Sequence, residues 1–258
     1  MALLTHSITS ALQSAYDDSS AALIQFENSA RYNQELRYTF ERTVSEVSRL
    51  GSELRILEIG AFTGVVSVAL KRLGHLVTAS DMPFVIKDPA LESLFAKDDI
   101  LTLAADLSHM PFPVADASFD LIVFNEVLEH LNFNSIPLLR EFHRILTPGG
   151  RVYCATPNLL SAKNRWLLLS GHSYINPVKD LLWNLEPGTG MSVGLHWREW
   201  SHAELVELFQ VAGFDTETHH FGLSTPNCSG PVRKTLVSLM YHLAPSLMPN
   251  QVGVFRKI

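Results

Sequence analysis

The segment from residue 54 to residue 70 constrains the fold of this chain more than any other. Residues 54–59 form a short apolar run that contains one acid, Glu58, and the turn that follows holds Gly60 and Gly64. The next residues have the composition and spacing of a helix. This order predicts a buried parallel strand, a tight turn and a helix that begins at the turn. The free backbone N–H groups of the first helical turn then face the end of the strand, so we expect a ligand site there.

Strands and helices alternate along the chain from residue 53 onward. Apolar runs of strand length are separated by segments with helical spacing. This alternation predicts an α/β fold with a mainly parallel, doubly wound sheet. We expect strands at residues 54–59, 75–80, 100–104, 119–124, 151–155, 214–221 and 252–258. We expect helices at residues 64–73, 89–95, 135–146, 201–212 and 232–243, with a helical turn at 127–131.

Two further segments lie outside this alternation. Residues 17–50 have helical composition, with capping residues at Asp17 and Asp18, and predict an N-terminal helical cap, residues 1–50. The cap either borders the ligand site or only covers a sheet edge. Within the main domain, residues 51–258, the segment 157–200 is rich in proline, glycine and tryptophan. It is too long for an ordinary connection, which predicts an inserted lid or binding loop.

The composition is that of an ordinary globular protein, with 47% hydrophobic and 18% charged residues. The net charge of −6 argues against non-specific binding of nucleic acid, which requires neutralisation of phosphates. The N-terminus lacks the features of a secretory signal, and no apolar run reaches the roughly 20 residues of a membrane span. Two cysteines without a metal or redox spacing suit a reducing compartment, so we expect a cytoplasmic protein. An apolar stripe in residues 232–243 has two interpretations, packing in the core or peripheral contact with a membrane.

Polar residues follow three of the predicted strands. Asp81, Asp106 and Asn125 each stand at or just after a strand end. Ligands of doubly wound sheets bind outside the carboxyl ends of the strands, so these side chains should converge with the glycine turn. The pattern alone is compatible with a dinucleotide or with a smaller adenosyl ligand. The G-x-G-x-x-G spacing of dinucleotide sites is missing here, since only Gly60 and Gly64 are glycines.

The order of the motifs is more specific than the turn itself. The segment Glu58-Ile59-Gly60-Ala61-Phe62-Thr63-Gly64 resembles the first motif of the class I S-adenosylmethionine-dependent methyltransferases, of the type 11 or 23 kind. The later segments of that family follow in order: Ser80-Asp81, Ala105-Asp106-Leu107, Phe119-Asp120-Leu121-Ile122-Val123, Leu146-Thr147-Pro148-Gly149-Gly150 and Ala155-Thr156-Pro157-Asn158. The resemblance implies a Rossmann-like, seven-stranded sheet with helices on both faces and an antiparallel last strand.

The resemblance also implies where the cofactor S-adenosylmethionine binds. Gly60 and its neighbours would approach the methionine part, Asp81 would bind the ribose hydroxyls, Asp106 and Leu107 would hold the adenine, and Asn125 would lie near the sulfonium. The implied cofactor residues are Glu58, Gly60, Ala61, Phe62, Gly64, Asp81, Met82, Asp106, Leu107 and Asn125. Phe62 departs from the family, which commonly has glycine at this position, so we expect its side chain to turn away from the ligand.

Glu126, Glu129 and His130 indicate chemistry on the acceptor side of the site. On a helix these residues would share one face, and two carboxylates with an imidazole could bind Mg²⁺ or Mn²⁺. The E-x-x-E-H segment resembles that of metal-binding methyltransferases that modify small-RNA 3′ ends or ubiquinone precursors. The segment that begins at His196 is similar to a further histidine segment of the RNA enzymes, which nominates His196 as a fourth ligand. The alternative is that His130 acts as a simple base without a metal. His130 and His196 are therefore the candidate catalytic residues.

These observations predict a methyltransferase that acts on oxygen, and less readily on nitrogen, of a small-molecule or glycan acceptor. The tryptophan-rich insertion and the segment 196–201 also resemble bacterial methyltransferases of surface-glycan and secondary-metabolite synthesis. An RNA acceptor is disfavoured by the acidic balance. The alternative is a non-catalytic protein that keeps the fold for binding or assembly, an interpretation motivated by Phe62.

Overall fold

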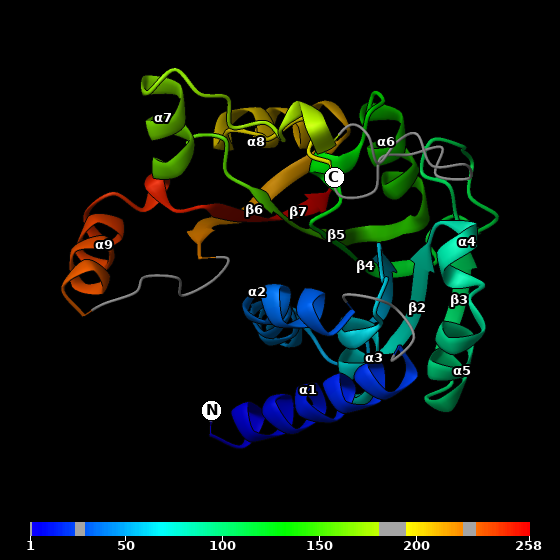
Figure 1. The fold of residues 1–258 in the computed structure, drawn as a ribbon. Helices are drawn as coiled ribbons and strands as arrows, with labels where there is room; N and C mark the ends of the chain where they lie inside the picture. The colour runs from blue at the N-terminus through cyan, green and yellow to red at the C-terminus, as the bar shows by residue number, and fades with distance from the viewer. Residues whose placement is uncertain (1, 24–28, 181–194, 224–230) are drawn as a thin grey trace.

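The computed structural model describes residues 2–23, 29–180, 195–223 and 231–258, and it contains one seven-stranded sheet (Figure 1). The strands lie in the order β3-β2-β1-β4-β5-β7-β6. Strand β7 runs antiparallel to both neighbours, whereas the other pairs are parallel. The predicted Rossmann-like, doubly wound sheet is therefore confirmed. The strands are β1 Arg55–Ile59, β2 Leu76–Asp81, β3 Leu101–Ala104, β4 Phe119–Asn125, β5 Leu146–Pro157, β6 Phe214–Gly222 and β7 Asn250–Lys257.

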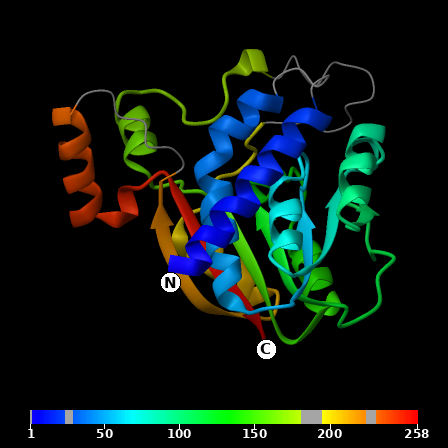
Figure 2. The same cartoon turned by 90° about the horizontal axis from the view of Figure 1, so that it is seen from below.

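Helices cover both faces of the sheet because the central strands carry apolar side chains on both sides. In β1, Ile56 points into one buried cluster and Leu57 into the other, as the alternation of a strand requires. Helices α1, α2, α3 and α5 lie over the first face, and α6 and α8 over the second (Figures 1 and 2). The helices are α1 Ala2–Ala22, α2 Ser29–Leu50, α3 Val65–Arg72, α4 Pro83–Ile86, α5 Pro89–Lys97, α6 Ile136–Ile145, α7 Ala162–Leu169, α8 His202–Val211 and α9 Pro231–Leu243, with 3₁₀ turns η1 Leu128–His130 and η3 Pro245–Leu247.

The direction of winding changes between β1 and β4. The chain runs outward from β1 to β2 and β3, then returns to pair β4 with the other edge of β1. The carboxyl ends of β1 and β4 therefore meet at a topological switch point, where ligands of such sheets bind. The glycine turn follows β1, and the predicted acceptor segment follows β4.

The N-terminal helical segment begins earlier than predicted. Helix α1 starts at Ala2, so the expected helix start near Asp17 is wrong. Asp18 lies inside α1, where it forms ion pairs with Arg72 of α3 at 2.5 Å and with Lys97 of α5 at 2.6 Å. These ion pairs hold α1 against the main domain. In the sequence, an acid with this role cannot be told apart from an acid that caps a helix. Helices α1 and α2 lie side by side across the sheet (Figure 2).

The described part of the insertion contains helix α7, which begins after its N-cap Ser161. Residues 181–194, with Trp183, lie outside the described residues. Helix α9 forms as predicted, but Leu236, Leu239 and Leu243 are 62%, 52% and 74% exposed. The interpretation that this stripe packs in the core is therefore wrong for these leucines. Among the described helices, none is both long enough and apolar enough to cross a membrane.

Candidate active site

The turn after β1 is shaped for close packing of backbone. Gly60 and Gly64 have φ values of +76° and +75°, which favour glycine. The amides of Gly60 and Ala61 donate to the carbonyl of Ser80 at 2.9 and 3.1 Å, which ties the turn to the end of β2. A Cβ on Gly60 would lie 2.5 Å from Cγ2 of Val127, in the segment after β4. The glycine turn therefore packs directly on the segment that begins the acceptor side.

Asp81 and Asp106 stand near the ends of neighbouring strands, as predicted. The carboxylate of Asp81 accepts hydrogen bonds from the amides of Phe62 at 2.9 Å and Met82 at 2.7 Å. Burial raises the pKa of Asp81, and the two amides only partly oppose it. Asp106 is more open to solvent. Burial would raise the pKa of Asp106, but its hydrogen bonds, led by those from Ser108, outweigh burial and lower it.

The acid of the turn motif is held inside the protein. Glu58 is 5% exposed, and its carboxyl accepts a hydrogen bond from the hydroxyl of Ser67 in α3. Burial raises the pKa of Glu58 to about 8; Ser67 opposes this shift, and the charge of Asp81 adds to it. At neutral pH the carboxyl is therefore mostly protonated, and it connects β1 to α3.

Phe62 does not turn away from the site. Its backbone has φ +28°, and its ring packs edge-on against Tyr32 of α2, with centroids 5.0 Å apart. Both residues line a cavity of about 10 Å³ together with Gly60, Asn125 and Glu126. This volume holds about one water molecule, against roughly 300 Å³ or more for a ligand pocket. The Tyr32–Phe62 pair therefore packs closely beside the glycine turn.

Leu107 and Asn125, two other predicted cofactor residues, contact other side chains of the protein. Leu107 is buried in the same core as Phe112. Asn125 ends β4, and its Nδ2 donates to Oγ1 of Thr43 in α2 at 2.8 Å, whereas its buried Oδ1 has no partner among the described residues. Helix α2 therefore contributes side chains to the site from both Tyr32 and Thr43.

The segment after β4 forms a helical turn within the predicted range 127–131, but Glu126 lies outside it. Glu126 has φ +51°, and its amide donates to the carbonyl of Ala155, which extends the pairing of β4 with β5. Only one 3₁₀ turn, Leu128–His130, follows. The expectation that Glu126, Glu129 and His130 share a helix face is therefore wrong, because β pairing holds Glu126 before any helix can start.

Glu129, on the acceptor side of the site, is fully buried. Its Oε2 accepts from the hydroxyl of Thr156 at 2.9 Å, and its Oε1 has no hydrogen-bond partner in the described chain. The neighbouring carboxyl of Glu126 accepts from Nδ2 of Asn250 at 3.0 Å. Burial raises the pKa of both glutamates, so this pair retains a proton above the usual range.

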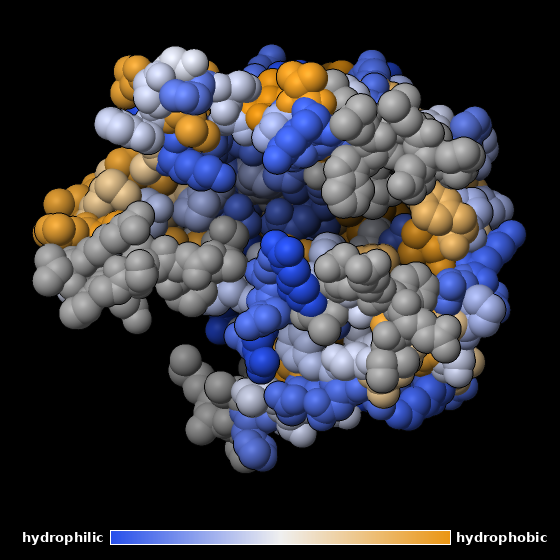
Figure 3. Space-filling view, viewed as in Figure 1, coloured by the Kyte–Doolittle hydropathy of each residue, from blue (hydrophilic) through white to orange (hydrophobic). Residues whose placement is uncertain are grey.

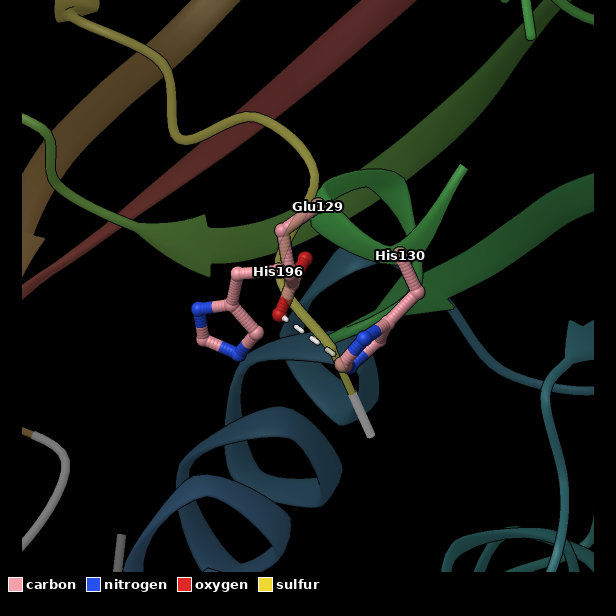
Figure 4. Close-up of side chains that lie close together, drawn as sticks. All are labelled: Glu129, His130 and His196. Atoms are coloured by element: carbon pink, nitrogen blue, oxygen red, sulfur yellow. Dashed lines mark ion pairs between the residues drawn. The ribbon is translucent and has the colours of Figure 1, made fainter. Parts of the chain in front are cut away.

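His196, from the end of the insertion, packs against His130 with ring centroids 5.0 Å apart (Figure 4). Nδ1 of His130 bonds to the carbonyl of Leu195 at 2.8 Å, and Nδ1 of His196 bonds to Oε1 of Glu199 at 3.2 Å. A carbonyl and a carboxylate accept, so Nδ1 carries the proton in each ring and Nε2 offers a lone pair when the ring is neutral. One ligand atom from each of Glu129, His130 and His196 lies within 4.8 Å of the others.

This donor set suits a divalent cation. Oε1 of buried Glu129 accepts no hydrogen bond in the described chain and lies 4.0 Å from Nε2 of His130. The Nδ1 atoms of both imidazoles are already fixed by outer groups, as is usual for histidines that bind metal. Two imidazoles fit Mn²⁺ better than Mg²⁺, which prefers oxygen ligands. Glu126, predicted as a further ligand, does not belong to this group of atoms.

The two histidines differ in their protonation. Burial lowers the pKa of His130. Burial acts in the same direction on His196, but the hydrogen bond to Glu199 and the charge of Glu129 outweigh it and raise the pKa of His196. His196 is therefore the ring that more readily carries a positive charge, whereas His130 stays neutral.

A larger depression lies behind Trp200, on the α8 side of the sheet. It has a volume of about 300 Å³ and is lined by apolar residues such as Leu131 and Leu208 and by charged residues such as Arg198 and Glu204. It holds none of the predicted cofactor or metal residues. We therefore assign the site to the switch point, where the buried titratable groups converge.

Sequence reasoning missed three residues of the site, namely Tyr32, Thr43 and Glu199. Tyr32 and Thr43 belong to no motif, and they reach the site only because α2 packs over the switch point. Glu199 follows His196 by three residues, so the sequence spacing alone could have identified its carboxylate as a hydrogen-bond partner of that imidazole.

The glycine turn at the switch point, the strand-end aspartates and the antiparallel last strand define the class I methyltransferase architecture. Residues 32–219 match the family described as "Methyltransferase domain". The chain belongs to this family of S-adenosylmethionine-dependent class I methyltransferases.

Similar proteins carry several methyltransferase names. The chain is 36% identical over 140 residues to the malonyl-[acyl-carrier protein] O-methyltransferase of Erwinia pyrifoliae, covering 53% of this chain and 51% of that protein. It is 31% identical over 105 residues to the ubiquinone biosynthesis O-methyltransferase of Xanthomonas campestris pv. campestris, covering 40% of this chain and 43% of that protein. The matches thus span about half the length of these curated relatives.

Solved structures show the same fold at low identity. The 1,6-didemethyltoxoflavin-N1-methyltransferase of Burkholderia thailandensis, with 1,6-didemethyltoxoflavin and S-adenosylhomocysteine bound, has a TM-score of 0.55 at 19% identity and covers 92% of this chain and 88% of its own. An S-adenosylmethionine-dependent methyltransferase from Mesorhizobium loti has a TM-score of 0.55 at 18% identity and covers 84% of this chain and 97% of its own. At these identities the likeness concerns the fold alone.

Proposed function

We propose that the chain is an S-adenosylmethionine-dependent O-methyltransferase whose acceptor is a small molecule or a glycan. The observation that carries the proposal is the convergence of Glu129, His130 and His196 within 4.8 Å, after the strand that neighbours the glycine turn. A hydroxyl acceptor must lose a proton during transfer, and these groups suit that task. Both named relatives are O-methyltransferases, which supports the choice of oxygen over nitrogen.

In this proposal the cofactor binds outside the carboxyl ends of β1 and β2. Each oxygen of Asp81 accepts one backbone amide and keeps a further lone pair, so the side chain can also take the two ribose hydroxyls. The Gly60–Gly64 turn and Met82 border the methionine and ribose parts, and Asp106 and Leu107 hold the adenine. When bound, the cofactor supplies a methyl group on a sulfonium, and the protein's part is to orient the acceptor oxygen in line with it.

The acceptor side has two variants in this proposal. In the first, Glu129, His130 and His196 would hold Mg²⁺ or Mn²⁺, which would lower the pKa of the acceptor hydroxyl. In the second, Nε2 of His130 takes the proton directly, because burial keeps this ring neutral. The unpartnered Oε1 of Glu129 favours the first variant, and the two imidazoles favour Mn²⁺.

Three further assignments belong to the proposal. Residues 1–50 act as a helical cap on the domain 51–258, and the insertion 157–200 acts as a lid that brings His196 to the site. Placement in the cytoplasm stays a prediction. A peripheral contact of α9 with a membrane is supported by the exposed Leu236, Leu239 and Leu243.

The test is methyl transfer by the full chain from radiolabelled S-adenosylmethionine to a panel of hydroxylated metabolites and sugars. We expect label on oxygen, loss of activity in chelator and recovery with Mn²⁺. His196→Ala should abolish both the recovery and the binding of Mn²⁺ seen by electron paramagnetic resonance. His172→Ala, at an exposed position, is the matched control. Label on nitrogen only would overturn the choice of oxygen, and activity unchanged by chelator would eliminate the metal variant.

A second candidate is a non-catalytic protein that keeps the fold for binding or assembly. The Tyr32–Phe62 pair beside a cavity of about 10 Å³ favours it. The two candidates differ in cofactor binding. A calorimetric titration that gives no heat with S-adenosylmethionine or S-adenosylhomocysteine would favour the non-catalytic protein.

A further inference from the structure

Arg42, in helix α2, is a half-buried cation without an ion pair among the described residues. Its Nη1 donates to the carbonyl of Leu223 at 3.3 Å. Its Nε and Nη2 are both shielded from solvent, and neither has a hydrogen-bond partner within the described chain. A guanidinium stays charged at any physiological pH, and leaving its donors unmet inside a protein is costly. Such a side chain indicates a position where an anion binds.

The two unmet donors form one edge of the guanidinium. Nε–H and Nη2–H point in the same direction, directly opposite to Nη1, and this edge matches a carboxylate in a bidentate pair. Nη1 rests against the end of β6, where a Cβ on Gly222 would lie only 2.3 Å from it. The free edge of Arg42 therefore faces away from β6.

The protein's own carboxylates near this edge have other partners. The charge of Arg42 acts on both Glu46 and Glu126, and in each case it favours the ionised form and lowers the pKa, against burial as the largest effect. Glu46 is held by His220 at 3.1 Å and by the hydroxyl of Tyr153 at 3.1 Å. Neither glutamate lies within ion-pair distance of Arg42 in the described structure, so a carboxylate from outside the chain is the missing partner.

Arg42 lies in α2 next to Thr43, whose hydroxyl accepts a hydrogen bond from Asn125 at the end of β4. Gly222 pairs with Asn250, whose side chain contacts Glu126, so this corner adjoins the acceptor side. The space-filling view shows a recessed, hydrophilic area between α2 and α8 (Figure 3).

We propose that Arg42 binds a carboxylate of the acceptor through its Nε and Nη2 edge, so that the acceptor is a hydroxylated carboxylic acid methylated at its hydroxyl. This inference rests on the proposed function, since it assigns one end of the same acceptor. A carboxylate fits better than a phosphate, because its single charge meets one guanidinium among several acidic side chains.

The experiment uses the full chain saturated with S-adenosylhomocysteine. The probe is 6-hydroxyhexanoate, compared with the uncharged 6-hydroxyhexanamide and with inorganic phosphate. Nitrogen-15 spectra follow the Nε–H of Arg42, whose burial slows its exchange and whose signal is assigned by its loss in Arg42→Lys. We expect a saturable shift with the carboxylate and none with the amide. Arg42→Gln should weaken carboxylate binding about tenfold or more. Arg31→Gln, in the same helix with a side chain 75% exposed, should not.

The outcomes separate this inference from the proposed function. S-Adenosylhomocysteine affinity should be the same in wild type, Arg42→Lys and Arg42→Gln, which also shows that the variants fold. Equal shifts with carboxylate and amide, or unchanged carboxylate affinity in both Arg42 variants, would overturn the inference. Tighter binding of phosphate than of the carboxylate would overturn the choice of acid. A wild-type chain that binds the carboxylate but no S-adenosylhomocysteine would instead overturn the proposed function.

Discussion

The cofactor side and the acceptor side of this site are assembled in different ways. The glycine turn lies between a strand and a helix that are consecutive in the chain, and its partners, Asp81 and Ser80, end the adjacent strand. On the acceptor side, His130 meets a segment 65 residues further along, and α2 reaches in from the N-terminal part. The cofactor side depends on local backbone conformation, whereas the acceptor side depends on packing between distant segments. Substitutions should therefore act differently on the two sides.

The largest effect is expected where the two sides touch, at Gly60. Gly60→Ala meets both a left-handed backbone and a contact of 2.5 Å with Val127, so it should lower the free energy of unfolding by about 3 kcal/mol. Gly74→Ala is the matched control, because Gly74 also has positive φ but nothing within 4 Å of its added Cβ. The control should cost about 1 kcal/mol. Urea denaturation measures both, and equal losses would contradict close packing at Gly60.

The next effect concerns the acceptor side alone. Glu199→Gln removes the carboxylate that orients His196, and the affinity for Mn²⁺ should fall by about 10- to 100-fold. Electron paramagnetic resonance titration measures this affinity. Glu207→Gln, at an exposed position of α8, should leave it unchanged. If Glu199→Gln binds Mn²⁺ like the wild type, Glu199 does not position a metal ligand.

A smaller effect on the cofactor side depends on pH. The pKa of Glu58 is about 8 in the folded state against 4.5 as the reference value, so the folded chain holds one more proton between these values. Stability is therefore highest below pH 4.5 for this group and falls as pH rises towards 8, by up to about 1.4 kcal/mol per pH unit. Glu58→Gln should flatten this part of the stability profile, whereas exposed Glu92→Gln should not. A wild-type profile that rises over this range would contradict a protonated Glu58.

The smallest effect is expected at α9, which belongs to neither side. Leu239→Ser at its 52% exposed position should change the free energy of unfolding by no more than about 0.5 kcal/mol. If α9 contacts a membrane, the same variant should bind less to anionic liposomes in a cosedimentation assay. Equal sedimentation of wild type and variant would argue against that contact.

The same contrast explains how far the sequence predicted the structure. Alternating strands and helices gave the correct sheet, because each element follows from local spacing, and the strand-end positions of Asp81 and Asn125 followed from it. The helix face expected to hold Glu126 together with Glu129 and His130 does not form, because β4–β5 pairing, a tertiary effect, holds Glu126. The start of α1 was missed because Asp18 serves a tertiary ion pair rather than a cap.

The site residues show the same contrast between what sequence motifs indicate and what tertiary packing decides. His196 was nominated by resemblance, and the structure brings it to Glu129 and His130. Tyr32, Thr43 and Arg42 had no sequence signal, because only the packing of α2 over the sheet gives them a place in the site. Phe62 was expected to turn aside, yet its ring forms a pair with Tyr32 that the local sequence does not contain.

Calorimetric titration with S-adenosylhomocysteine tests most directly the claim that the cofactor binds at the glycine turn and Asp81, independently of the acceptor side. The wild-type chain should bind one equivalent. Asp81→Ala should weaken binding at least about tenfold, since it removes charged hydrogen-bond acceptors. Glu129→Gln should change the affinity by no more than about threefold. No binding by the wild type, or an equal loss in both variants, would contradict the account.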